Sequence, residues 1–257
     1  MVLIIGSYAN LTIYTQNKVP GLRWVKTQLS APPSPPQNLR GMALNSGQDL
    51  KLAWDAPVGE TPDSYEILCD GSTIASNLPK TTTTYIISGA QYVCKQVQVV
   101  AVKGSDRSAA ELDLSLATTS QITIYDANSY PSCPPKAWGK LTTSPNVSLV
   151  DICQSEVSGG ANTAYFVYKA SKIYDCSQTP KAGSCNVNIG FGPAYSSNLA
   201  PSTGYVDQLQ PFQGQKYYIY TTDGYYGVIS INSVGSDNVT LSISLQNKVP
   251  GLRWVKQ

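Results

Sequence analysis

The side chains that most often carry out enzyme chemistry are scarce in this sequence. The chain has no histidine, which excludes Ser-His-Asp and Cys-His catalysis and histidine-based zinc sites. A pair of carboxylates can hydrolyse glycosides, but Asp126 and Asp175 occur in turn-like sequences. No phosphate-binding loop or nucleophile-elbow motif is present, and GFGP at 190–193 is interpreted as a glycine turn. We therefore expect no enzyme activity, no catalytic residue, no cofactor and no metal.

The six cysteines suit disulfide chemistry better than metal binding. Their number is even, they lack Cys-x-x-Cys spacing, and no histidine can share a metal with them. The sequence alone does not select one pairing among Cys69, Cys94, Cys133, Cys153, Cys176 and Cys185. The last two enclose a short Pro- and Gly-containing segment, so a local bridge is expected there. Proximity in sequence favours a bridge between Cys133 and Cys153.

Composition predicts an extracellular or cell-surface β protein. Charged residues make up 13% of the 257 residues, and the net charge is +2. Nucleic acid binding requires clustered Lys and Arg, so no nucleic-acid partner is expected. The chain has 17 Tyr and only 3 Phe, and tyrosine suits half-exposed strand faces. The opening residues MVLIIG are too few for a signal peptide or a membrane span, so no membrane span is expected in the chain. Three Asn-x-Ser/Thr sequences offer candidate glycosylation sites at Asn10, Asn146 and Asn238.

Short alternating runs of apolar and polar residues predict strands throughout the chain. No long stretch has the 3.6-residue period of a helix, and the runs are bounded by Gly, Pro, Asn and Asp. The clearest runs are LKLAW (50–54), SYEIL (64–68), KQVQVVAV (95–102), QITIY (121–125), AYFVY (164–168), KYYIY (216–220), YYGVISI (225–231) and VTLSISL (239–245). An Asp-Gly pair at 223–224 predicts a hairpin between the two Tyr-rich runs.

Two breaks in this pattern divide the chain. Residues 27–38 contain four prolines and predict a stiff spacer, and residues 115–120 read as a softer polar break. We expect an all-β protein with two β-sandwich domains in tandem. The domains are predicted at 30–117 and 118–257, after an N-terminal extension at 1–29.

The first predicted domain resembles a fibronectin type III module. The resemblance rests on the Pro-rich entry to Leu39, the run LKLAWDAP with Trp54, and the runs SYEIL and KQVQVVAV. It covers about a third of the chain and implies that Trp54 packs between two sheets. It also implies that Cys69 and Cys94 end and begin neighbouring strands, within reach of a disulfide. Modules of this family act mostly as spacers or binding platforms, so the resemblance does not itself name a function.

An internal duplication is the sharpest feature of the sequence. Residues 16–26 read QNKVPGLRWVK, and residues 246–256 repeat all eleven letters. The similarity extends upstream, where NLTIYT (10–15) aligns with TLSISL (240–245). Val-Pro-Gly predicts a turn, and Trp24 and Trp254 are candidate anchors for a pocket. The charged residues of the first copy, Lys18, Arg23 and Lys26, are interpreted as a solvated edge.

The duplicated strand needs a partner, because a lone strand leaves its backbone groups unpaired. Residues 1–26 could pair within their own chain, add a strand to a neighbouring subunit, or end the preceding unit of a longer tandem array. An artificial duplication, such as a repeated tag, is the trivial alternative. We predict pairing with a neighbouring subunit through the inter-subunit residues Leu11, Ile13, Val19 and Trp24.

These features predict a structural subunit of an extracellular filament, a pilus-like fibre or an adhesin stalk. The predicted assembly resembles fibres built by donor-strand exchange, in which the partners are copies of the same chain. The alternative is a carbohydrate-binding accessory region of a secreted glycosidase, with glycans as partners. That alternative depends on a cluster of tyrosines around one hairpin: Tyr217, Tyr218, Tyr220, Tyr225 and Tyr226.

Overall fold

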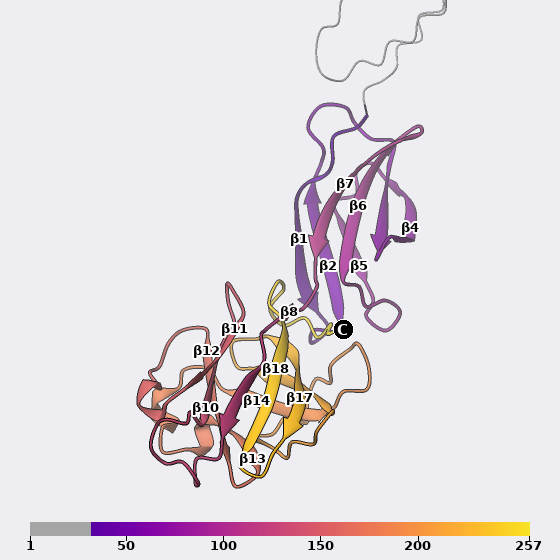
Figure 1. Ribbon diagram of the computed structural model, residues 1–257. Coiled ribbons are helices and arrows are strands. Elements are labelled where there is room, and N and C mark those ends of the chain that lie inside the picture. Colours follow the sequence, from indigo (N-terminus) through magenta and orange to yellow (C-terminus); the bar gives the residue numbers. More distant parts are fainter. Residues whose placement is uncertain (1–31) are drawn as a thin grey trace, which may run out of the picture.

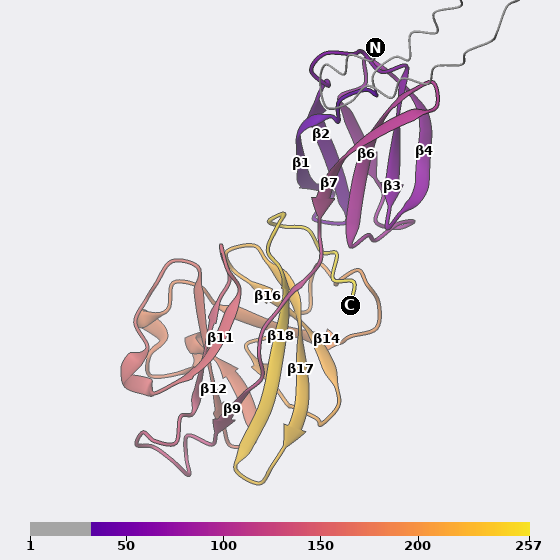
Figure 2. The same cartoon turned by 45° about the horizontal axis from the view of Figure 1, so that its top comes forward.

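The computed structural model describes residues 32–257, which are built almost entirely from antiparallel strands (Figure 1). In this part of the chain the only helical elements are three short 3-10 helices, η1 (Gln154–Glu156), η2 (Cys176–Gln178) and η3 (Ala182–Ser184). The strands form two β-sandwiches placed end to end, and a second view keeps them separate (Figure 2). The all-β prediction is therefore confirmed.

The first sandwich packs a three-stranded sheet against a four-stranded one. The first sheet has the order β1 (Gln37–Leu44), β2 (Asp49–Asp55), β5 (Thr84–Ile87), and the second has the order β4 (Ser72–Pro79), β3 (Ser64–Cys69), β6 (Gln96–Lys103), β7 (Asp106–Asp113). Alternate residues of β2, β3 and β6 point inward, as a strand period of two requires. Trp54 is buried between the sheets and meets Tyr65 edge-on.

The second sandwich is larger. One sheet has the order β11 (Ser148–Ile152), β10 (Trp138–Thr142), β12 (Thr163–Lys169), β13 (Lys172–Asp175), β15 (Gln208–Leu209). The other has the order β14 (Ile189–Ala194), β16 (Lys216–Thr221), β17 (Tyr226–Val234), β18 (Asn238–Gln246), β8 (Ala117–Thr118), and β9 (Ile122–Tyr125) also pairs with β18. The core between these sheets is aliphatic and aromatic, and β18 contributes Leu241, Ile243 and Leu245 to it.

All eight predicted runs form strands, and the Asp-Gly pair joins β16 to β17 as expected. The polar break at 115–120 lies between β7 of the first sandwich and β9 of the second, and it contains the short strand β8, in which Thr118 and Ser244 share a hydrogen bond and the Thr119 amide donates to Ile243. One interpretation is wrong. GFGP at 190–193 is not a turn but lies within β14, where Gly190 and Gly192 leave room for the ring of Tyr205.

Three disulfides connect neighbouring segments within each sandwich. Cys69 pairs with Cys94, Cys133 with Cys153, and Cys176 with Cys185, which are the expected pairs. The last two fasten the loops that cover the outer face of the five-stranded sheet, over a small cluster around Trp138 and Val167. Disulfides of this kind are consistent with a secreted or extracellular protein.

Candidate inter-subunit site

The C-terminal copy of the repeat, residues 246–256, is called the tail. It leaves β18, turns, and crosses to the near end of the first sandwich, as the yellow end of the ribbon shows (Figures 1 and 2). The Gln246 side chain is buried and accepts hydrogen bonds from the amides of Lys248 and Val249. The tail therefore changes direction immediately after β18, at a turn stabilised by the Gln246 side chain.

A second turn follows at Val249–Leu252. The Leu252 amide donates to the Val249 carbonyl, and Gly251 between them has a φ of 82°. Pro at the second position and a residue of positive φ at the third are the requirements of a type II turn. The Gly251 amide also donates to Gly224, in the β16–β17 hairpin. The Val-Pro-Gly turn predicted from the sequence is thus present in this copy.

Three apolar side chains of the tail complete the core of the first sandwich. Val249, Leu252 and Trp254 are buried in the same cluster as Leu50 and Trp54. The indole Nε1 of Trp254 donates to the Gln48 carbonyl at 2.7 Å. The sequence places the tail with the second domain, but these side chains belong to the core of the first.

The intervening side chains face the other sandwich. Val255 packs with Ala200, Tyr218 and Val228 of the second sandwich. Arg253 is only 8% exposed, and its guanidinium donates to the carbonyls of Ser46 in the first sandwich and Ala200 in the second. Within residues 32–257 no carboxylate forms an ion pair with it. Both of its hydrogen bonds go to main-chain carbonyls, one from each sandwich, so this buried cation joins the two domains.

Backbone hydrogen bonds hold the tail as a short added strand. The Arg253 amide donates to Gly47 at 2.9 Å, the Ala200 amide donates to Arg253 at 2.8 Å, and the Val255 amide donates to Asn198 at 2.7 Å. Leu199 and Trp254 form an antiparallel bridge. We call the surface that receives the tail the tail seat: residues 46–48, Asp70, Gly89, 198–200 and Gly224.

Two glycines allow the tail to approach so closely. A Cβ on Gly47 would lie 1.9 Å from the Gly251 carbonyl oxygen. A Cβ on Gly89 would lie 2.0 Å from the Gln48 carbonyl oxygen and 2.8 Å from Trp254 Nε1. Any side chain at either position would therefore push against the tail or the carbonyl that holds it.

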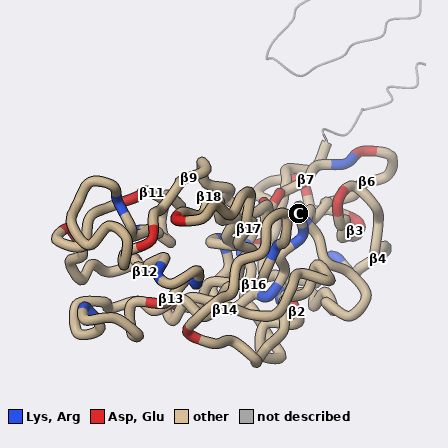
Figure 3. Tube along the Cα trace, turned by 60° about the horizontal axis from the view of Figure 1, so that its bottom comes forward, with Lys and Arg blue, Asp and Glu red and all other residues tan. Residues whose placement is uncertain are grey.

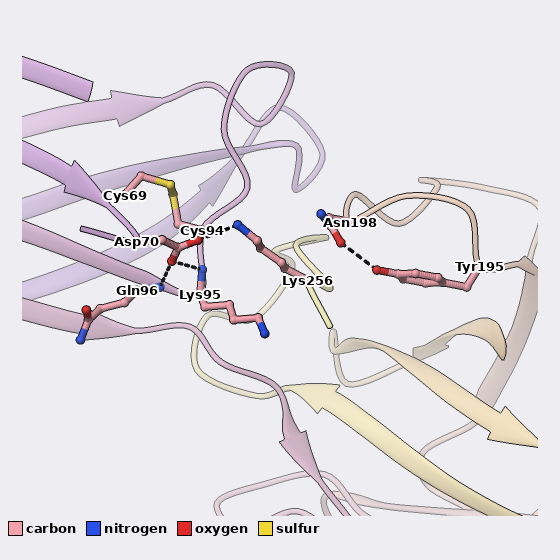
Figure 4. A network of polar contacts seen from close by, with 8 residues as sticks. All are labelled: Cys69, Asp70, Cys94, Lys95, Gln96, Tyr195, Asn198 and Lys256. Atoms are coloured by element: carbon pink, nitrogen blue, oxygen red, sulfur yellow. Dashed lines mark hydrogen bonds and ion pairs between the residues drawn. A yellow bond between two sulfur atoms is a disulfide. The ribbon is translucent and has the colours of Figure 1, made fainter. Parts of the chain in front are cut away.

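An ion pair fixes the last residue of the tail (Figure 4). Lys256 Nζ lies 2.6 Å from Asp70, whose other oxygen accepts the amides of Lys95 and Gln96. Asp70 and Gly71 form the two-residue loop between β3 and β4, with φ of 49° and 80°, as a type I′ hairpin requires. Burial raises the pKa of Asp70, but these hydrogen bonds outweigh burial and hold the pKa below the usual value of an aspartate.

The charged residues of the tail differ from the solvated edge expected for this sequence. Lys248 is exposed, as expected, but Arg253 is buried and Lys256 is paired. Elsewhere, charged positions of both signs are sparse along both sandwiches (Figure 3). The solvated-edge interpretation concerns Lys18, Arg23 and Lys26, which lie outside the described residues. In the second copy the guanidinium of the equivalent Arg253 donates to two main-chain carbonyls.

The four predicted inter-subunit residues, Leu11, Ile13, Val19 and Trp24, lie outside the described residues, as does Asn10. Their equivalents in the second copy are Leu241, Ile243, Val249 and Trp254, and each of these is at most 3% exposed. Of the other candidate glycosylation sites, Asn146 is exposed in the loop between β10 and β11, and Asn238 is half-buried at the start of β18.

The sequence did not point to the seat residues. Asp70 precedes a glycine between two alternating runs, which is a hairpin signal, but a turn gives no hint of an ion pair 186 residues away. Asn198 and Ala200 lie in a loop without motif. Only the repeat itself indicated that the tail is a recognition segment.

The tyrosines around the β16–β17 hairpin pack within the chain. Tyr217 and Tyr218 are buried, while Tyr220 and Tyr226 lie 4.7 Å apart and both meet Tyr205. Burial raises the pKa of Tyr205 and of Tyr226. Tyr220, Tyr225 and Tyr226 are half-buried, so sugar stacking on this hairpin stays a prediction.

A cavity of about 360 Å³ lies elsewhere, beside the disulfide-fastened loops of the second sandwich. Its lining includes the aromatic residues Tyr130, Trp138 and Tyr174 and the amide side chains of Asn128, Gln154 and Gln178. Within residues 32–257 no cluster of His, Cys, Asp or Glu could hold a metal ion, and no helix there is long and apolar enough to cross a membrane.

Comparison with known proteins yields no family. No family model and no curated protein matches the chain. Among solved structures, the spore cortex lytic enzyme SleM of Clostridium perfringens is 21% identical with a TM-score of 0.27, and the match covers 32% of this chain and 28% of that enzyme. A DUF4466 family protein of Parabacteroides merdae is 9% identical with a TM-score of 0.40, over 86% of this chain and 96% of that protein.

Proposed function

We propose that this protein is the structural subunit of an extracellular filament, pilus-like fibre or adhesin stalk, assembled by β-strand addition between copies. The observation that carries the proposal is the burial of the repeat. The copy that the structure describes places Leu241, Ile243, Val249 and Trp254 in the two cores. A second copy of such a strand and tail needs an equally buried environment.

We assign this buried environment to a neighbouring subunit, because the equivalent place in the second sandwich is already occupied by β18. β18 pairs with β17 on one side and with β8 and β9 on the other. Residues 10–15 therefore cannot occupy the same place without displacing β18. An edge of a neighbour's sheet offers free backbone donors and acceptors.

The remaining architecture suits a fibre. Three disulfides stabilise a chain outside the cell. The first sandwich, with its three-plus-four strands and its central Trp54, supports the resemblance to a fibronectin type III module. In this proposal that module is a spacer between assembly contacts.

The test compares assembly of the parent chain with that of three variants. Ile13→Asp should prevent polymerisation, because Ile13 corresponds to the buried Ile243 and an unpaired charge is costly in an apolar site. Thr12→Asp is the matched control, because Thr12 corresponds to Ser242, which faces the other side of the sheet. Electron microscopy and light scattering should show fibres for the parent and the control. Native-looking fibres after deletion of residues 1–15 would contradict the proposal.

A second candidate function is glycan binding at the cavity rather than at the Tyr hairpin. Aromatic rings with nearby amide side chains suit an uncharged, hydroxyl-rich ligand. Calorimetry with soluble oligosaccharides should then detect binding that Tyr174→Ala weakens at least tenfold. Unchanged binding by that variant, or none by the parent, removes this candidate.

A further inference from the structure

We propose that the tail seat is an exchange site: residues 16–26 of a second copy of this chain can replace residues 246–256 in it. The inference deepens the proposed function and rests on it for its biological role. It names a second contact between copies, separate from the strand at residues 10–15. With its own tail in the seat the chain is in a closed state. With residues 16–26 of a second copy in the seat, the two chains are linked.

The chemistry of the occupants is identical. Residues 16–26 and 246–256 agree at all eleven positions. Trp24 can therefore donate to Gln48 as Trp254 does, and Arg23 can donate to Ser46 and Ala200 as Arg253 does. The contacts do not select one copy. The chain's own tail is favoured because it is covalently attached to β18, which gives it an effective concentration at the seat in the millimolar range.

The seat is also built to receive a peptide. Its backbone contacts with the tail come from the loop at 46–48 in the first sandwich, and from the loop at 198–200 and Gly224 in the second. The tail contributes one extended segment between them and passes through neither sheet. Beyond Gln246, which is the last residue of β18, an added strand of this kind can be exchanged for an identical one without rearranging the strands of either sandwich.

The exchange stops at the start of the tail. Ser244 of β18 is buried and hydrogen-bonded to Thr118, and Leu245 is fully buried. The N-terminal copy has Tyr14 and Thr15 at these positions. A tyrosine in place of Ser244 would displace β8, and a threonine in place of Leu245 would lose apolar burial. The exchangeable unit is therefore residues 16–26 and not the preceding strand.

The first experiment uses a synthetic labelled peptide, QNKVPGLRWVK, and the same peptide with alanine for tryptophan. The protein is the full chain carrying Trp24→Ala and Trp254→Ala, so that neither of its own copies competes well. Fluorescence anisotropy should show binding of the parent peptide. The alanine peptide should bind at least about 100-fold more weakly, as expected for loss of a buried Trp. The parent peptide should bind the unmodified chain at least tenfold more weakly than the double variant.

If circular dichroism shows that the double variant is unfolded, the matched pair Arg23→Lys and Arg253→Lys replaces it, because lysine keeps the charge but loses the two-carbonyl contact. Equal binding of the two peptides, or equal binding by the modified and unmodified chains, overturns the proposal.

The second experiment separates exchange between chains from exchange within one chain. Two differently tagged batches of Trp254→Ala are refolded together, and one tag is pulled down. Co-purification that disappears when Trp24→Ala is added supports exchange between copies. A strictly monomeric Trp254→Ala chain overturns it.

The two levels of proposal fail in different ways. Fibres that depend on Ile13, combined with no peptide binding, leave the proposed function intact and remove the exchange site. Peptide binding combined with no fibres under any condition leaves the exchange site intact and removes the proposed function.

Discussion

At the scale of single residues, Arg253 best explains how the two sandwiches are joined. A buried cation is costly unless its donors are filled. Here the acceptors are main-chain carbonyls from both domains, and the two carbonyls cannot both be supplied if the domains separate. The same residue type on the surface would contribute little.

Replacing Gly47 by alanine should displace the tail, while the same change at Gly204 should only strain the backbone. The two glycines have φ of 82° and 86°. At Gly47 the new Cβ meets the Gly251 carbonyl at 1.9 Å, and at Gly204 it meets nothing within 4 Å. We expect Gly204→Ala to lower the free energy of unfolding by about 1–2 kcal/mol. Gly47→Ala should lower it by about 3–5 kcal/mol more, the cost of losing a buried Trp. Urea unfolding of both variants measures the difference, and equal losses would refute the close contact.

The pairing of Asp70 with Lys256 should depend on pH in the acid range. The pKa of Asp70 in the folded protein lies below its usual value, so folding favours the ionised form. Its contribution to stability is therefore complete above about pH 4 and is lost as the pH falls through the folded pKa. The stability of Asp70→Asn relative to the parent, measured between pH 2 and pH 7, should show a deficit that shrinks toward pH 2. A deficit independent of pH would contradict this assignment.

At the scale of elements, the Cys69–Cys94 disulfide connects the end of β3 to the segment before β6, next to Asp70. Replacing both cysteines by serine should lower the free energy of unfolding by about 2–4 kcal/mol and should also loosen the tail. The matched control removes Cys176 and Cys185, which lie in the other sandwich and enclose a shorter loop. Limited proteolysis after Lys248 should accelerate only in the first variant. Equal acceleration in both would show that the tail does not depend on this bridge.

The elements also show what the sequence could and could not predict. Strands with a buried face, such as β2 and β18, have a clear alternation and were predicted. β1, β4 and β7 were not, because they are half-exposed and rich in polar residues. β8 is two residues long and exists because Thr118 and Ser244 meet across the sheet. The repeat predicted the importance of the tail, but its seat depends on carbonyls from loops, and any residue type supplies a carbonyl.

At the scale of the whole molecule, the tail makes one folding unit of two sandwiches. Its side chains alternate between two cores, with Trp254 in one and Val255 in the other. The parent chain should therefore unfold in a single calorimetric transition, whereas Trp24→Ala combined with Trp254→Ala should show two. Val58→Ala is the control, because Val58 is 75% exposed, and it should keep one transition. A single transition in the double variant would show that the domains are coupled by other contacts.

The distance along the chain between the tail and its seat has a consequence for biosynthesis. The hydrogen bond from Trp254 to Gln48 spans 206 residues. The first sandwich is synthesised before any of the second, yet its core lacks Val249, Leu252 and Trp254 until these residues have been synthesised. During translation the nascent module therefore has an apolar gap where the tail later packs. Its native packing is therefore completed only after the second sandwich has been synthesised, although its own strands emerge earlier.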